Sequence, residues 1–153
     1  MATASAKKTI GNESFLTDNT IRSFLRDADP DSNLLLDDFE FTPEEIRNAR
    51  TLIVDKWNET PPPVGVYQYD NFPYRYYYMM GTCAHLMYMA ANRYRRNELQ
   101  YTIGGGAVAD QSKADSYDKA ADKLMAMFNE WMKQEKLRRN MEDGFGQDTG
   151  RYY

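Results

Sequence analysis

An unusual density of tyrosine between residues 67 and 101 constrains the fold of this chain more than any other feature. The chain has 12 tyrosines, and nine of them lie in this interval. From about Arg75 to Arg96, large apolar or aromatic residues and alanines fall on nearly all sides of a helix: Tyr76, Tyr77, Met80, Ala84, Met87, Tyr88, Ala91 and Tyr94. A helix that is apolar all round is buried on several sides. The segment therefore predicts either the central helix of a bundle or a helix that also contacts another subunit.

Length, charge and cysteine content exclude several classes of protein. A chain of 153 residues corresponds to one domain with one core. Its net charge of −4 argues against a dedicated duplex-DNA binder. The first eight residues lack the apolar core of a secretory signal, and no run of about 18 apolar residues predicts a membrane span. The single cysteine, Cys83, allows neither an internal disulfide nor a Cys/His zinc site, which fits a reducing cytoplasm.

The N-terminal third predicts an arm, a short helix and a short extended segment. Residues 1–16 are small and polar, and they predict a flexible arm. Residues 17–28 predict a helix capped by Thr17, because apolar residues recur there at helical spacing. The turn-forming residues 29–33 end it, and residues 34–41 predict a short extended segment.

The sequence from Thr42 onward carries the clearest helix start in the chain. Thr42 is the expected N-cap, Pro43 occupies the first helical position, and Glu45 completes a capping box. The three consecutive prolines at 61–63 end the helix. Its buried face is predicted to consist of Ile46, Ala49, Ile53 and Trp57.

The C-terminal half predicts a β-hairpin between two long helices, after an extended stretch at 64–72. Residues 99–103 alternate in polarity, the three glycines 104–106 supply a turn, and residues 107–109 return, which predicts the hairpin. The last helix is expected to start at Asp110 or Ser112 and to end near Asn140. The predicted fold class is mainly α: a small helical bundle with a short β-hairpin and extended N- and C-terminal arms.

The last thirteen residues, 141–153, form a segment of their own. They contain three glycines and too few apolar residues to fold alone, yet they include Phe145, Tyr152 and Tyr153. Such a composition is typical of a segment that becomes ordered on a partner. We therefore expect an arm at 1–16, a helical-bundle domain at 17–140 and a docking tail at 141–153.

The residues that could carry catalysis or hold a cofactor have simpler structural interpretations. Cys83 and His85 are two positions apart on a helix and point to different sides, which favours a buried thiol and a core histidine. The triglycine 104–106 is followed by no Gly-Lys-Ser/Thr, so a turn is favoured over a phosphate-binding loop. No acid/base pair or cofactor motif is found. The sequence predicts a protein that is not an enzyme and has no cofactor.

A carboxylate cluster and two basic clusters also have structural interpretations. Asp115, Asp118 and Asp122 share a helix face, but interleaved lysines favour a solvated face over a metal site. Cations at 93–96 and 133–139 lie where helix ends are predicted, and they favour dipole compensation. Contact of the 93–96 cluster, which comprises Arg93, Arg95 and Arg96, with a nucleic-acid backbone remains the alternative.

At this point the order of features resembles the head-to-tail connector proteins of tailed bacteriophages, the adaptor or neck proteins below the portal. The resemblance covers about residues 38–153 and leaves 1–37 unexplained. The features that carry it are, in chain order, Phe39-Glu-Phe41-Thr-Pro43-Glu-Glu, Asn58-Glu-Thr-Pro-Pro-Pro63, Asp70-Asn-Phe-Pro73, Ala90-Ala-Asn-Arg-Tyr-Arg-Arg-Asn97, Leu99-Gln-Tyr101 with its glycine turn, Asp110-Gln111, the helix from Tyr117 to Asn140, and the Gly/Tyr tail.

The resemblance implies a structural virion protein, made in the host bacterial cytoplasm and located at the neck of the particle. It implies a helical subunit that forms a homo-oligomeric ring, usually dodecameric, under the portal protein, where it completes the head and offers a site for other neck or tail proteins. DNA would pass through the channel without specific binding, and no membrane is involved. The implied portal-binding residues are Gly144, Phe145, Gly146, Arg151, Tyr152 and Tyr153, and the ring-interface candidates are Tyr77, Tyr78, Tyr88, Tyr101 and Ile103.

Three alternatives stay open on the sequence. One is another neck component, a stopper or tail terminator, although such proteins are usually richer in β-strand. Another is a small helical nucleic-acid-binding regulator that uses the 93–96 cluster and the cations at 133–139. The third is an enzyme that uses Cys83 or His85.

Overall fold

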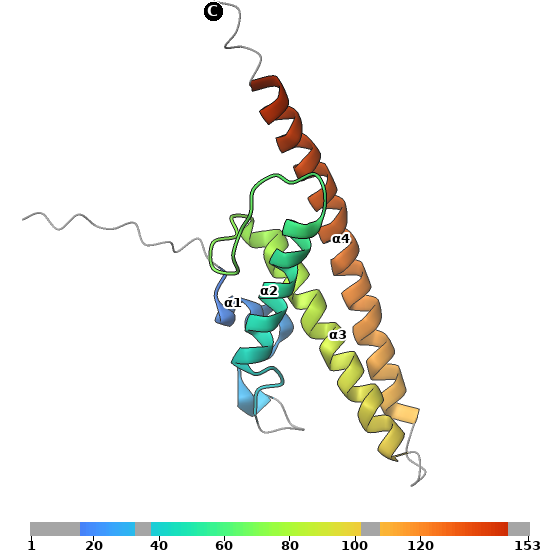
Figure 1. The fold of residues 1–153 in the computed structure, drawn as a ribbon. Coiled ribbons are helices and arrows are strands. Elements are labelled where there is room, and N and C mark those ends of the chain that lie inside the picture. The colour runs from blue at the N-terminus through green and yellow to red at the C-terminus, as the bar shows by residue number, and fades with distance from the viewer. Residues whose placement is uncertain (1–15, 33–37, 102–107, 147–153) are drawn as a thin grey trace, which may run out of the picture.

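The computed structural model describes residues 16–32, 38–101 and 108–146, and among these it contains helices and no strand (Figure 1). The first helix, α1 (Asp18–Leu25), is followed by a single 3-10 turn, η1 (Pro30–Ser32). The next helix is α2 (Pro43–Glu59). Two long helices, α3 (Arg75–Tyr101) and α4 (Val108–Gly146), complete the described chain.

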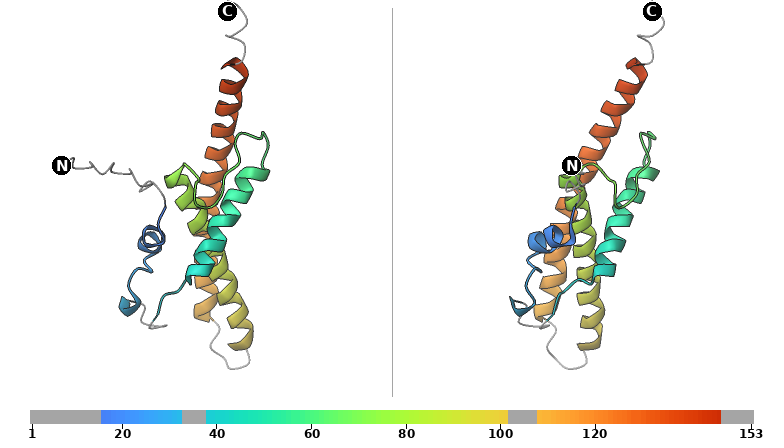
Figure 2. Two further views of the ribbon diagram at one scale, coloured as in Figure 1. Left: turned by 60° about the vertical axis from the view of Figure 1, so that its left-hand side comes forward. Right: turned by 90° about the vertical axis from the view of Figure 1, so that its left-hand side faces the viewer.

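The long helices α3 and α4 form an antiparallel hairpin that is the spine of the molecule (Figures 1 and 2). Helix α2 packs along α3, and α1 contacts α3 beside it. The irregular segment 60–74 connects the end of α2 to the start of α3. The C-terminal end of α4 extends beyond the other helices in both figures. No described helix is both long enough and apolar enough to span a membrane.

The helix starts predicted from the caps Thr17 and Thr42 are confirmed. The Thr17 side chain accepts a hydrogen bond from the backbone N–H of Thr20 (3.2 Å). The Thr42 hydroxyl accepts from the N–H of Glu45 (3.2 Å), and the Glu45 carboxylate accepts from the N–H of Thr42 (2.8 Å), which completes the capping box. All four residues of the predicted α2 face, Ile46, Ala49, Ile53 and Trp57, are fully buried.

The predicted β-hairpin at 99–109 is wrong. Helix α3 continues through Tyr101 and α4 begins at Val108, so the predicted strands overlap helical residues. Packing between the two long helices keeps the backbone helical up to their connection, and this outweighs a few residues of alternating polarity. The predicted caps, Asp110 and Ser112, lie inside α4 for the same reason, and α4 ends at Gly146 rather than near Asn140. The glycines 104–106 lie outside the described residues.

The predicted extended segments form no strand where the structure describes them. Residues 38–41 and 64–72 are irregular, while 33–37 lie outside the described part. Of the predicted arms, 1–16 and 141–153, residues 1–15 and 147–153 lie outside it as well, whereas Leu16 is buried and 141–146 belong to α4. The mainly helical fold class is therefore correct for the described residues, without the hairpin.

A buried ion pair connects α1 to the start of α2. Asp27 accepts a hydrogen bond from Arg22 (2.8 Å) and two more from the backbone N–H groups of Glu40 (2.6 Å) and Phe41 (3.2 Å). The Arg22 guanidinium also lies 4.3 Å from the ring centroid of Phe39. Both charged side chains are buried, and these contacts compensate for the free energy of solvation that they lose.

Gly81 of α3 sits where α2, α3 and α4 meet. A Cβ atom at this position would lie 2.6 Å from Cδ1 of Ile53 on α2 and 3.2 Å from Cδ2 of Phe128 on α4. Both neighbours are fully buried, so neither can move without disturbing the core. The absence of a side chain at Gly81 therefore allows the three helices to approach closely.

We expect Gly81→Ala to lower the free energy of unfolding by about 1–2 kcal/mol and Gly81→Val by more, because overpacking outweighs the gain of about 1 kcal/mol in helix propensity. Urea denaturation measures the effect. Gly144→Ala is the matched control, since nothing lies within 4 Å of a Cβ there and the residue is also helical. A Gly81→Ala protein as stable as the Gly144→Ala protein would contradict this role.

Candidate functional site

A buried lysine, Lys136, anchors α4 about three turns before its C-terminal end. Lys136 is 1% exposed, and its amine donates hydrogen bonds to the carbonyl oxygens of Thr60 and Pro62 (3.2 Å to Pro62). The amine also lies 4.9 Å from the ring centroid of Trp57. Burial lowers the pKa of Lys136. The contacts fix α4 to the end of α2 and to the loop that follows it.

An aromatic cluster surrounds this anchor and connects α2, α3 and α4. Trp131 of α4 stacks on Tyr77 of α3, with ring centroids 4.3 Å apart and planes 6° from parallel. Trp131 also lies 5.6 Å from Trp57 of α2 and 4.7 Å from Tyr74. Phe72 of the connecting loop packs edge-on against Trp57 at 5.4 Å. The cluster makes α4 one rigid unit with the rest of the bundle as far as its Lys136 turn.

Glu135 completes the anchor with charged contacts. Its carboxylate accepts hydrogen bonds from Tyr74 (2.6 Å) and Arg138 (2.6 Å), and Nε of Arg139 lies 3.3 Å away. The hydrogen bond from Arg138 lowers the pKa of Glu135 to about 2, helped by Tyr74 and opposed by burial. Arg139 also donates a hydrogen bond to the hydroxyl of Tyr67.

Beyond the Lys136 turn, α4 projects from the bundle (Figure 1). Leu137 is 57% exposed and Met141 is 50% exposed, one helical turn apart. Gly144, the first of the predicted portal-binding residues, is exposed in the same segment. Phe145 and Gly146 continue the helix.

The remaining predicted portal-binding residues, Arg151, Tyr152 and Tyr153, lie outside the described residues. The structure therefore places the start of the predicted docking segment at the far end of a rigid helix.

Two of the ring-interface candidates lie at the start of α3. Tyr77 is half-buried and stacks on Trp131, so one part of its ring reaches the surface. Tyr78 is fully buried, and its hydroxyl donates to the carbonyl oxygen of Tyr69 (2.6 Å) and lies 3.4 Å from Nε of Arg50. The Tyr78 side chain belongs to the core of the subunit and is not presented to a neighbour.

The other ring-interface candidates are spread along the molecule. Tyr88 is half-buried, and its hydroxyl donates to Asp122 of α4 (2.6 Å), which raises the pKa of Tyr88 to about 12. Tyr101 is the last residue of α3, and Ile103 lies outside the described residues. Of the candidates whose side chains the structure describes, Tyr77 and Tyr78 are chain neighbours and Tyr88 lies further along α3.

Cys83 and His85 lie in different environments on α3. Cys83 is fully buried, and burial raises the pKa of its thiol to about 12. His85 is half-buried beside a surface pocket whose lining includes Asp55 and Lys56, and its pKa is lowered by burial and by Lys56. The predicted buried thiol is confirmed.

The three carboxylates of the cluster predicted from the sequence, Asp115, Asp118 and Asp122, have partners within the chain. Asp118 forms an ion pair with Arg95 of α3, and Asp115 lies 3.8 Å from the same guanidinium. Asp122 accepts the hydrogen bond from Tyr88. Within the described residues no three His, Cys, Asp or Glu side chains are placed to hold a metal ion.

The basic clusters are largely engaged in internal contacts. Arg93 donates to the carbonyl oxygen of Glu40 (2.9 Å) and pairs with Glu45 (2.5 Å), and Arg95 pairs with α4. In the second cluster, the cations of the anchor contact α2, the connecting loop or neighbouring carboxylates. Arg96 and Lys133 are exposed. Most of the cations that a nucleic-acid regulator would use are thus committed to holding the bundle together.

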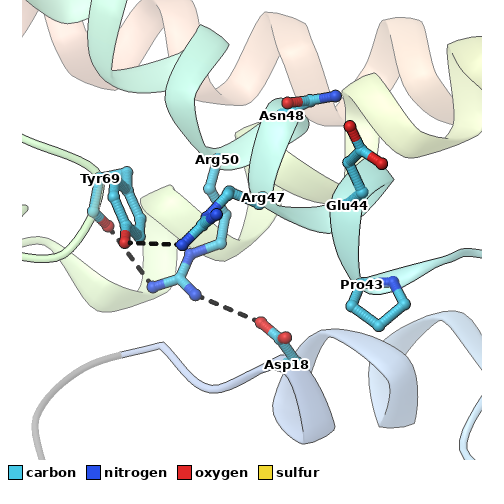
Figure 3. A pocket seen from close by; sticks show the side chains of 7 residues that line it. All are labelled: Asp18, Pro43, Glu44, Arg47, Asn48, Arg50 and Tyr69. Atoms are coloured by element: carbon cyan, nitrogen blue, oxygen red, sulfur yellow. Dashed lines mark hydrogen bonds and ion pairs between the residues drawn. The ribbon is translucent and has the colours of Figure 1, made fainter.

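A surface pocket beside α1 and α2 contains two arginines that the sequence analysis did not single out (Figure 3). Arg50 pairs with Asp18 (3.2 Å) and donates to the carbonyl oxygen of Tyr69 (3.4 Å), while Arg47 donates to the Tyr69 hydroxyl (3.4 Å). The i, i+3 spacing of the two arginines in the sequence indicates that they lie on one face of the helix. Because Asp18 and Glu44 also line this pocket of about 600 Å³, its charges balance, and it indicates no anionic ligand.

Comparison of the chain with protein-family models, with curated proteins and with solved structures found no match.

We expect replacement of Glu135 by glutamine to lower the free energy of unfolding at pH 7 by about 1–2 kcal/mol, because charged hydrogen bonds are lost. The folded pKa of about 2 lies below the ordinary value of 4.5, so this stabilisation is complete above about pH 4.5 and disappears as pH falls toward 2. Urea denaturation of both proteins from pH 7 to pH 3 tests it. Glu142→Gln, which removes only an exposed pair with Arg138, is the control. A pH-independent difference would contradict the assignment.

The Cys83 thiol is expected to resist alkylation in the folded protein. Burial and the raised pKa leave almost no thiolate at pH 8. Iodoacetamide labelling followed by mass spectrometry is expected to show labelling at least about a hundredfold slower in buffer than in concentrated urea. Rapid labelling of the folded chain would show an accessible thiol and favour the enzyme alternative.

Proposed function

We propose that this protein is a structural subunit of a bacteriophage neck, a head-to-tail connector that assembles as a ring below the portal. The ring would complete the filled head and present the site to which the tail attaches. The subunit would have no catalytic role and no cofactor. The order of sequence features described above, from Phe39 to the Gly/Tyr tail, supports this assignment.

The observation that carries the proposal is the shape of α4. A long helix is fixed to the bundle by Lys136 and the aromatic cluster, and it then continues away from the other helices to Gly146. The end of α4 lies away from the body of the subunit (Figure 2). A docking segment that must reach a groove on another ring benefits from such a rigid extension.

The helical fold also favours an adaptor over the two other neck components. Stoppers and tail terminators usually carry extensive β-structure, whereas the described residues here include four helices and no strand. The nucleic-acid regulator is less well supported, because Arg93, Arg95 and Lys136 already make internal contacts. The net charge of −4 suits a ring around a channel through which DNA must slide.

The proposed mechanism couples docking to ordering of the tail. The segment after α4 carries Arg151, Tyr152 and Tyr153 behind a single glycine, Gly150, and it would become ordered in grooves of the portal. Because the ordering cost is offset only on the portal, assembly would be sequential. Lateral contacts between neighbouring subunits, with Tyr77 as a half-exposed candidate, would then close the ring.

Removal of residues 147–153 is expected to leave the bundle intact and to abolish portal binding. The full-length chain with an N-terminal tag is purified from phage-infected cells, and the mass of the purified complex is measured by native mass spectrometry. The complex should contain a second and larger ring protein, the portal. The truncated chain should unfold at the same temperature as the full-length chain, and no portal protein should be recovered with it.

Val66→Ala, at an 82% exposed position of the connecting loop, is the control that should retain portal binding. Unimpaired portal binding by the truncated chain would contradict the proposed role of the tail. A full-length chain recovered without any ring protein from cells that contain assembled portals, or recovered with nucleic acid instead, would contradict the connector function itself.

A further inference from the structure

The amine of Lys56, on α2, has no negatively charged partner among the described residues. Its side chain reaches α4, where the amine lies 3.5 Å from Sδ of Met125. A thioether sulfur is a weak hydrogen-bond acceptor, so this contact does little to stabilise an ammonium group. The carboxylates nearest to it in the sequence, Asp55 and Glu59, form no ion pair with it. The charged form of Lys56 therefore lacks the compensation that a buried cation needs.

Lys136 shows what Lys56 lacks. The Lys136 amine is held by two carbonyl oxygens and by the face of Trp57, and its side chain is shut off from solvent. Lys56 is only half-buried, and the Met125 sulfur is its hydrogen-bond partner. Burial lowers the pKa of Lys56. More of its amine is therefore uncharged near neutral pH than in an exposed lysine such as Lys133.

Lys56 also lines a surface pocket of about 540 Å³, together with residues of α2, of the proline loop and of α3. His85 of α3 is in this lining, and its pKa is lowered by burial and by Lys56. Its imidazole is therefore uncharged at about pH 8 and gives the amine no counter-ion. Asp55 and Glu59 line the pocket as well, which disfavours a negatively charged ligand. The pocket thus favours an uncharged small molecule beside the amine.

We propose that Lys56 is a modification site, at which the amine is acylated by an uncharged thioester that enters this pocket. A lysine amine that is desolvated without a counter-ion is activated as a nucleophile. Its nitrogen lone pair attacks the thioester carbonyl carbon, a C–N bond forms and the C–S bond breaks. The sulfur leaves as a thiol with the proton that the nitrogen loses, and nothing is oxidised or reduced. The amide product is uncharged, so the cost of burying a charge disappears.

This site goes beyond the proposed connector function and does not rest on it. Acylation consumes the amine once, so it is a modification of the subunit and not catalysis. A failed portal-binding experiment would leave the reactivity of Lys56 unchanged. An unreactive Lys56 would likewise leave the connector function unchanged.

Site-resolved acylation of the purified full-length chain tests the proposal. The folded chain is exposed briefly at about pH 8 to S-acetyl-N-acetylcysteamine, an uncharged thioester, and mass spectrometry measures the rate at each lysine. We expect Lys56 to react about threefold or more faster than the exposed Lys133, and Lys136 to react slowest. In concentrated urea the three rates should become similar. A folded chain in which Lys56 reacts no faster than Lys133 would overturn the proposal.

A carboxylate placed beside the amine tests the cause of this reactivity. Leu52→Glu, at a 46% exposed position, puts a glutamate four residues before Lys56, the spacing at which it stabilises a lysine ammonium. The acylation rate of Lys56 should fall about threefold or more, with the rate of Lys133 unchanged. Thr51→Glu, also at an exposed position, is the matched control, because it adds the same charge on another side of the helix. Equal Lys56 rates in the two variants would overturn the proposal.

Discussion

The burial of Lys136 is the interaction on which the placement of α4 depends. Transfer of an ammonium group from water into a protein interior costs several kcal/mol unless it is compensated. Here the carbonyl oxygens of Thr60 and Pro62 and the face of Trp57 provide that compensation. These partners exist only when the end of α2, the proline loop and α4 meet in one arrangement. The contact therefore selects one register of α4 against the bundle, and this register determines which turns of α4 project beyond it.

The parts of the fold that local chemistry determines could be predicted from the sequence. The Thr42 capping box and the apolar spacing that follows involve residues within a few positions of one another, and both were predicted correctly. The region around 99–109 was predicted incorrectly, because its alternation spans too few residues to distinguish a strand from the end of a helix. The length of α4 was underestimated for a related reason. The start of α4 lies beside α3, and no local pattern shows this packing, whereas its last turns are exposed.

The candidate site was harder to predict, because its contacts join residues far apart in the sequence. Composition drew attention to the arginines near the end of α3, but their partners, Glu45 and Asp118, lie on two other helices. Tyr78 looked like an interface residue, yet it turned out to be in the core. Apolar residues that are exposed for a partner and those that are buried within the subunit look alike in a sequence. Only the fold separates Tyr78 from Leu137.

The geometry of α4 separates the part of the helix that holds the subunit together from the part that can meet a partner. The helix has 39 residues and is about 58 Å long at 1.5 Å per residue. Its turn at Lys136 is fixed to the end of α2 and to the connecting loop, whereas Leu137 and Met141 are exposed. Under the proposed function, the contacts around Lys136 therefore set the position from which the docking tail starts.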